Sequence, residues 1–147
     1  MAGDTKTLRC VLLADRHHGL TEGVRGLLES TAETVMMVAD TASLFESVER
    51  LQPTMAVIDL SLISGDSLHW LPRLRARCPS MKVIVVSVHD EPSVCRATMA
   101  AGADGFVLKR AIATELLAAV DAVMGGQCYV PAGVLDLPSE SEEDQAP

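Results

Sequence analysis

The feature that most constrains the fold of this chain is a set of five short, nearly continuous apolar runs. Runs of Val, Ile, Leu and Met without polar alternation are typical of parallel strands covered on both faces. We therefore expect one parallel sheet with a buried layer on each side. The predicted strands are Arg9–Asp15, Thr34–Ala39, Met55–Asp59, Lys82–Ser87 and Gly105–Lys109.

The segments between and after these runs repeat apolar residues every three or four positions, which indicates amphipathic helices. Strict alternation of five strands with five helices predicts a doubly wound α/β fold. Three boundary signals support the helices. Ser43 and Glu46 resemble a capping box, Pro92 suits a first helical turn, and Gly125 with Gly126 suits a helix end.

The charge of the 147-residue chain, −8 in total, is unevenly distributed. Residues 1–110 carry 12 Lys and Arg against 13 Asp and Glu, whereas residues 111–147 carry seven acids and no base. The last segment also lacks any helical or strand period, which is typical of linkers and disordered tails. We therefore expect an N-terminal extension at 1–8, one globular domain at 9–126, and an acidic linker or disordered tail at 127–147.

Composition also restricts the partners and the cellular location. The sequence has no basic patch typical of nucleic-acid binding, and no apolar run reaches the roughly 18 residues of a membrane span. The four cysteines form no CxxC pair, which favours reduced thiols. We therefore expect a cytoplasmic protein that contacts neither nucleic acid nor membrane directly.

Polar residues end four of the predicted strands: Asp15, Asp59, Ser87 and Lys109. In an open parallel sheet the carboxyl ends of the strands meet at one edge, where ligands bind. Two carboxylates suit a hard cation such as Mg²⁺. Asp59, beside an ammonium and a hydroxyl, has the chemistry of a nucleophile that accepts a phosphoryl group. The alternative is that each strand simply leaves the core on a polar residue.

Four motifs extend this pattern across residues 9–126: VLLAD, AVIDLSL, VIVVSVHD and AAGADGFVLKRA. In order and spacing they resemble the receiver domain of bacterial two-component response regulators, most closely those of NarL/LuxR-type transcription regulators. The resemblance implies a flavodoxin-like sheet in the order 2-1-3-4-5. It also implies phosphorylation from a sensor histidine kinase or phosphotransfer protein, and homodimers.

Matched position by position, the resemblance makes Asp59 the phosphate acceptor. Asp15, Asp59 and the backbone carbonyl of Ser61 correspond to the Mg²⁺ ligands. Ser87 and Lys109 correspond to the hydroxyl and ammonium groups that act on the phosphoryl group.

Other residues correspond to family positions that respond to phosphorylation or that affect access to the phosphorylation site. Ser87 and Phe106 fall where the family has its switch pair, although Phe106 also suits a simple core position. Val88 is bulkier than the residue common there and could narrow access to Asp59. His89 could contact the water that removes a phosphoryl group, or could simply be a surface histidine.

Arg16 departs from the family pattern, because a second acid normally follows the first and ligates the metal directly. Three interpretations remain open. Arg16 weakens Mg²⁺ binding and leaves Asp59 rarely phosphorylated; its guanidinium replaces part of the metal's role by holding phosphoryl oxygens; or it points to solvent. His17 and His18 follow it, and either a metal site or a solvated loop suits them.

The leading function is therefore a signalling receiver that regulates transcription through an effector domain absent here, with Mg²⁺ weakly bound or absent. The alternative is a stand-alone receiver that acts as a phosphorylation-independent interaction module. No enzyme activity is expected beyond self-phosphorylation from a kinase phosphohistidine or a small phosphodonor. A phosphatase with an aspartate nucleophile is disfavoured because Leu60 and Ser61, rather than a DxD pair, follow Asp59. A flavodoxin-like electron carrier is disfavoured because DRHHGLTEG is a poor phosphate loop.

Overall fold

The computed structural model describes residues 8–16, 18–63 and 68–132. Its centre is a five-stranded sheet in the order β2-β1-β3-β4-β5, with every neighbouring pair parallel. This confirms the predicted doubly wound fold and its strand order. The strands are β1 (Leu8–Ala14), β2 (Ala32–Val38), β3 (Met55–Asp59), β4 (Lys82–Ser87) and β5 (Gly105–Leu108).

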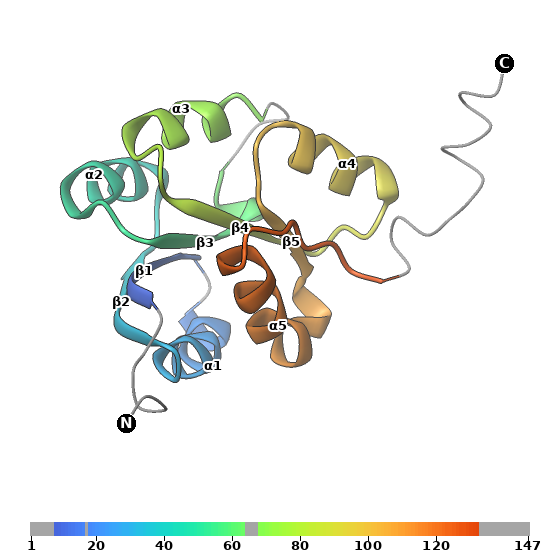
Figure 1. Cartoon of the computed structure of the whole chain (residues 1–147), viewed down its shortest axis with the longest axis horizontal. Coiled ribbons are helices and arrows are strands. Elements are labelled where there is room, and N and C mark those ends of the chain that lie inside the picture. The colour runs from blue at the N-terminus through green and yellow to red at the C-terminus, as the bar shows by residue number, and fades with distance from the viewer. Residues whose placement is uncertain (1–7, 17, 64–67, 133–147) are drawn as a thin grey trace, which may run out of the picture.

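Within the described residues, five α-helices and two short 3-10 helices lie between and after these strands. Helices α1 and α5 cover one face of the sheet, and α2, α3 and α4 cover the other (Figure 1). The helices are α1 (His18–Glu29), α2 (Thr41–Leu51), α3 (Trp70–Arg77), α4 (Pro92–Ala100) and α5 (Ile112–Met124). The 3-10 helices are η2 (Leu60–Leu62), after β3, and η3 (Lys109–Ala111), after β5.

Each face of the sheet buries its own apolar core. Successive side chains of a strand point to opposite faces, so Leu12 of β1 joins the core under α2, α3 and α4, while Leu13 joins the core under α1 and α5. Both cores are almost entirely aliphatic, with Phe106 and Trp70 as the aromatic members of the first. The continuous apolar runs of the sequence are explained by this two-sided burial.

Strand and helix boundaries differ from the sequence prediction at several points. Leu8, assigned above to an extension, is the first residue of β1 and is fully buried. The capping box predicted at Ser43 is wrong. Asp40 caps α2, and its carboxylate accepts a 2.7 Å hydrogen bond from the Ser43 N–H. Asp40 is the cap rather than Ser43 because its extended backbone places a charged acceptor at the exposed N–H groups of the first turn.

The helix signals further along the chain are confirmed. Pro92 occupies the first turn of α4. Gly125 follows the last residue of α5, and Gly126 has φ of +89°, a conformation that favours glycine.

The segment after α5 returns to the sheet. The Tyr129 N–H donates to the Asp104 carbonyl at 3.1 Å, and the Tyr129 carbonyl accepts from the Phe106 N–H at 2.9 Å. These bonds place Tyr129 in a parallel bridge with Gly105, on the outer edge of β5. Tyr129, which falls in the segment predicted to be a linker or tail, is therefore attached to the domain.

Candidate functional site

The carboxyl ends of the strands bring the predicted polar residues to one edge of the sheet. In the register of β1 against β3, Asp15 falls beside Asp59, the last residue of β3. Ser87 is the last residue of β4, and Lys109 directly follows β5. The convergence expected from the four polar strand ends is therefore present.

Asp59 is the centre of this cluster and is only 3% exposed. Lys109 Nζ donates to Asp59 Oδ2 at 2.5 Å. Burial raises the pKa of Asp59, but the hydrogen bonds from Lys109 and Ser61 outweigh it, so the pKa lies below the usual value for aspartate. The carboxyl group is therefore ionised at neutral pH, which is the form that can act as a nucleophile or bind a cation.

The chain turn after β3 supplies the other partners of Asp59. The chain enters η2 at once, with Asp59 as its N-cap. Asp59 Oδ1 accepts two hydrogen bonds from Ser61, one from its N–H and one from its Oγ, both 2.9 Å long. The Ser61 carbonyl is a predicted site group, whereas the role of the Ser61 hydroxyl is not predicted from the sequence. The Asp-x-Ser spacing of a side-chain-capped turn was the available signal.

Arg16 reaches the same turn from the end of β1. Its Nη2 donates to the Ser61 carbonyl oxygen at 3.1 Å. That oxygen is the atom that the resemblance assigns to the metal, so a positively charged donor lies where a cation would bind. Asp15, the neighbour of Arg16, is buried, whereas Arg16 itself is exposed.

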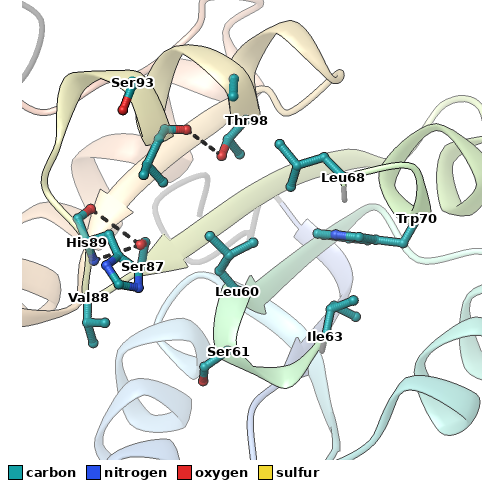
Figure 2. Close-up of a pocket in the computed structure, with 12 residues that line it drawn as sticks. Leu60, Ser61, Ile63, Leu68, Trp70, Ser87, Val88, His89, Ser93 and Thr98 are labelled. Carbon is teal, nitrogen blue, oxygen red and sulfur yellow. Dashed lines mark hydrogen bonds between the residues drawn. The ribbon is translucent and has the colours of Figure 1, made fainter. Parts of the chain in front are cut away.

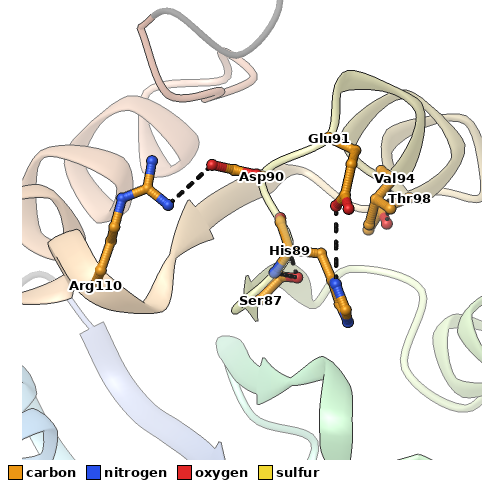
Figure 3. A network of polar contacts seen from close by, with 7 residues as sticks. All are labelled: Ser87, His89, Asp90, Glu91, Val94, Thr98 and Arg110. Carbon is orange, nitrogen blue, oxygen red and sulfur yellow. Dashed lines mark hydrogen bonds and ion pairs between the residues drawn. The ribbon is translucent and has the colours of Figure 1, made fainter.

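Ser87 interacts mainly with the loop that follows its own strand. Its Oγ accepts from the His89 N–H at 2.9 Å and donates to the His89 carbonyl at 3.3 Å (Figure 3). The His89 imidazole lies 3.8 Å from the Glu91 carboxylate. A further ion pair, Arg110 to Asp90 at 3.1 Å, joins this loop to the residues after β5.

The remaining predicted residues lie around this cluster. Phe106 is fully buried in the core beneath α2, α3 and α4. Val88 is 61% exposed at the rim of the site, and its predicted effect on access to Asp59 stays a prediction. His17 and the His18 side chain lie outside what the structure describes.

Comparison with known proteins decides the family. Residues 11–121 match the family model described as the response regulator receiver domain. The chain belongs to this family. Receiver domains are regulatory modules of two-component systems, they interact with sensor kinases or phosphotransfer proteins, and they generally bind Mg²⁺ for phosphorylation.

The sequence relatives of this receiver domain are bacterial transcription regulators of the NarL/LuxR type. It is 30% identical to the transcriptional regulatory protein DegU of Brevibacillus brevis, over 82% of this chain and 52% of DegU. It is 29% identical to the DNA-binding transcriptional activator EvgA of Escherichia coli, over 82% of this chain and 59% of EvgA. The chain thus spans between about half and two thirds of the length of such relatives.

Solved structures agree with this fold. The RcsB response regulator of Salmonella typhimurium superposes with a TM-score of 0.78 at 26% identity, over 86% of this chain and 64% of RcsB. The isolated receiver domain of RcsB, in the presence of the phosphomimetic BeF3−, gives 0.77 at 26% identity over 86% of this chain and 95% of that domain. None of the helices within the described ranges is long and apolar enough to cross a membrane.

Proposed function

We propose that this receiver domain regulates transcription as part of a longer protein, and that its switch operates with little or no Mg²⁺-dependent phosphorylation of Asp59. The observation that carries the proposal is the 3.1 Å contact between Arg16 Nη2 and the Ser61 carbonyl oxygen. A sensor kinase or phosphotransfer protein is the expected upstream partner. A second copy of the chain is the expected dimer partner.

The groups at this edge of the sheet do not fit a Mg²⁺ ion as they are arranged. The Ser61 carbonyl already accepts from a guanidinium, and Asp59 Oδ1 already accepts two hydrogen bonds. Within the described residues, no three His, Cys, Asp or Glu side chains are grouped so as to hold a metal ion. A metal here would have to displace these contacts.

The charge of Arg16 opposes a cation as well. One pair of unit charges ~4 Å apart interacts with about 4 kcal/mol at an effective dielectric near 20. Replacing an acidic ligand by arginine turns an attraction to Mg²⁺ into a repulsion of that order. Arg16 is exposed and can turn its guanidinium into water, which lowers this cost without restoring the missing carboxylate.

A second candidate function is favoured by the direction from which Arg16 approaches. Lys109 contacts Asp59 Oδ2, while Arg16 contacts the turn that holds Asp59 Oδ1. Two cations on either side of an acceptor carboxylate form a site for an anionic group. In this alternative the guanidinium holds phosphoryl oxygens, and Asp59 is phosphorylated without Mg²⁺.

The deciding experiment is the intact mass of the protein after incubation with acetyl phosphate, with and without Mg²⁺. We expect no adduct on the wild type and a Mg²⁺-dependent phosphoryl adduct on Arg16→Asp. The adduct should vanish when Asp59→Asn is added. Arg9→Asp is the matched control, because Arg9 is also exposed on β1 and donates to a backbone carbonyl, that of Gln52 at 3.3 Å.

The other outcomes are equally informative. A Mg²⁺-dependent adduct on the wild type would contradict the proposal and show that Arg16 is tolerated. An adduct that forms without Mg²⁺ and is lost in Arg16→Ala would establish the second candidate. If Arg16→Asp stayed unmodified, or if Arg9→Asp gained the adduct as well, Arg16 could not be the cause.

A further inference from the structure

A cavity of about 450 Å³ lies beside the candidate site, with η2 and the start of α3 on one side and helix α4 on the other (Figure 2). Its apolar walls come from Leu60, Ile63, Leu68 and Trp70 on one side and from Val94 on the other. This volume falls within the range of small-molecule sites in proteins, and such sites are mostly apolar with a few polar groups.

The two ends of the cavity differ in chemistry. The buried indole of Trp70 lies at one end, and the His89 ring lies at the other, with Leu60 between them (Figure 2). The hydroxyl of Ser93 adds a polar group from α4. Among the described lining residues there is no Asp, Glu, Lys or Arg, so the walls do not demand a charged ligand.

The rim of the cavity is open to solvent. Val88 lines it and is one of two large hydrophobic residues that the described part of the chain exposes, at 61%. Ser93 and Ala97 of α4 also line it and are exposed. A ligand that covered Val88 would remove apolar surface from water, which favours binding.

We propose that this cavity binds a small, flat, largely apolar aromatic molecule that carries a hydrogen-bond acceptor at one end. The aromatic part lies against Trp70 and the leucines, and the acceptor faces the N–H of the His89 imidazole. Offset contact between aromatic rings favours a flat ligand over a branched aliphatic one.

The cavity shares Ser61 and Ser87 with the candidate site. A bound molecule therefore contacts the turn that holds Asp59 and the loop that holds the Ser87 hydroxyl, and it can bias both without a phosphoryl group. Binding itself is independent of the proposed function. Its use as an input signal rests on the proposal that phosphorylation is impaired.

The test uses anilinonaphthalene sulfonate, an aromatic probe with a flat naphthalene ring and a sulfonate as the acceptor, and the full chain without Mg²⁺ or phosphodonor. Trp70 is the only tryptophan of the protein and lines the cavity, so its fluorescence follows binding, and the variants below locate the site. We expect saturable one-to-one binding with quenching of Trp70. Ala97→Phe should fill the cavity and weaken binding at least about tenfold.

Ala100→Phe is the matched control, because Ala100 is an exposed alanine of the same helix that does not line the cavity. It should bind the probe as the wild type does. Ser93→Phe is a second filling variant, used if circular dichroism shows that Ala97→Phe is not folded.

Binding that does not saturate, or that is equally strong in the filled and control variants, would overturn the proposal. A failure of the cavity proposal would leave the mass experiment on Arg16 unaffected, and the reverse also holds.

Discussion

The candidate site has two halves that differ in how deeply their charged side chains are buried. The acceptor half consists of Asp59, Ser87 and Lys109, and the cation half consists of Asp15, Arg16 and the Ser61 carbonyl. In the acceptor half, a buried carboxylate is neutralised by a lysine whose side chain is 15% exposed. In the cation half, the charged group in contact with the carbonyl is an exposed arginine.

This difference indicates where the chemistry of the site can change at low cost. Removing one partner of a buried ion pair leaves a charge without compensation, which is strongly destabilising. An exposed side chain can change its charge with little effect on folding. Under the proposed function, this receiver domain has lost its cation affinity at Arg16 while its acceptor half remains intact.

The largest effect on stability is expected from Lys109→Met. Among the described residues, the variant leaves the buried Asp59 carboxylate with the hydrogen bonds from Ser61 but without its ion-pair partner. We expect the free energy of unfolding, measured by urea denaturation at neutral pH, to fall by about 3 kcal/mol. Lys82→Met, at the start of β4, is the control and should change it by less than about 0.5 kcal/mol. Equal losses of unfolding free energy in both variants would show that the ion pair between Lys109 and Asp59 contributes no more to stability than an ordinary lysine.

Protonation of Asp59 acts on the same pair with a smaller effect. Its pKa is lowered in the folded state, so its contribution to stability is complete above the ordinary value of about 4 for aspartate. It is lost as the pH falls through the folded-state pKa. The unfolding free energy of the wild type should therefore fall relative to that of Asp59→Asn as the pH is lowered into the acid range. A difference independent of pH would contradict this.

Ser61→Ala separates the two halves. It removes the hydroxyl that donates to Asp59 Oδ1 but keeps the backbone N–H and the carbonyl that accepts from Arg16. We expect a loss of about 1 kcal/mol in unfolding free energy. Loss of one donor should also raise the pKa of Asp59. Carboxyl titration by nuclear magnetic resonance checks that direction, and an unchanged pKa would exclude the hydroxyl as a contributor.

The smallest effect on stability is expected from Arg16→Ala. The exposed guanidinium contributes one hydrogen bond, so unfolding free energy should change by less than about 0.5 kcal/mol. Mg²⁺ affinity, measured by titration calorimetry, should nevertheless rise at least about tenfold because a repulsive charge is removed. A large loss of stability in Arg16→Ala, with no change in Mg²⁺ affinity, would show that Arg16 stabilises the fold and does not oppose the cation.

Sequence reasoning was most successful where burial dictates the residue type. Both faces of the sheet are covered, so all five strands are recognisable as apolar runs, and β3 and β4 match their predicted bounds. Boundaries were less predictable where a polar side chain competes. Asp40 could not be distinguished from Ser43 as the cap of α2, because both residue types favour that position.

The site was predictable in outline, because strand ends of a parallel sheet must converge. Its contacts were not. The reach of Arg16 to the Ser61 carbonyl depends on the conformation of a long side chain and of the η2 turn, and neither leaves a periodic signal. The cavity beside Trp70 could not be predicted from the sequence either, because it depends on the spacing between α4 and the residues of η2 and α3 that face it.

The attachment of Tyr129 to β5 determines which part of the domain is in contact with the segment that follows α5. The described chain departs from the edge of the sheet, beside Gly105 and Phe106, rather than from the end of α5. Two backbone hydrogen bonds are worth about 1–3 kcal/mol together, so thermal fluctuation can open and reclose this attachment. We therefore expect a displacement of β5 to be transmitted through these two bonds to the segment that follows Tyr129.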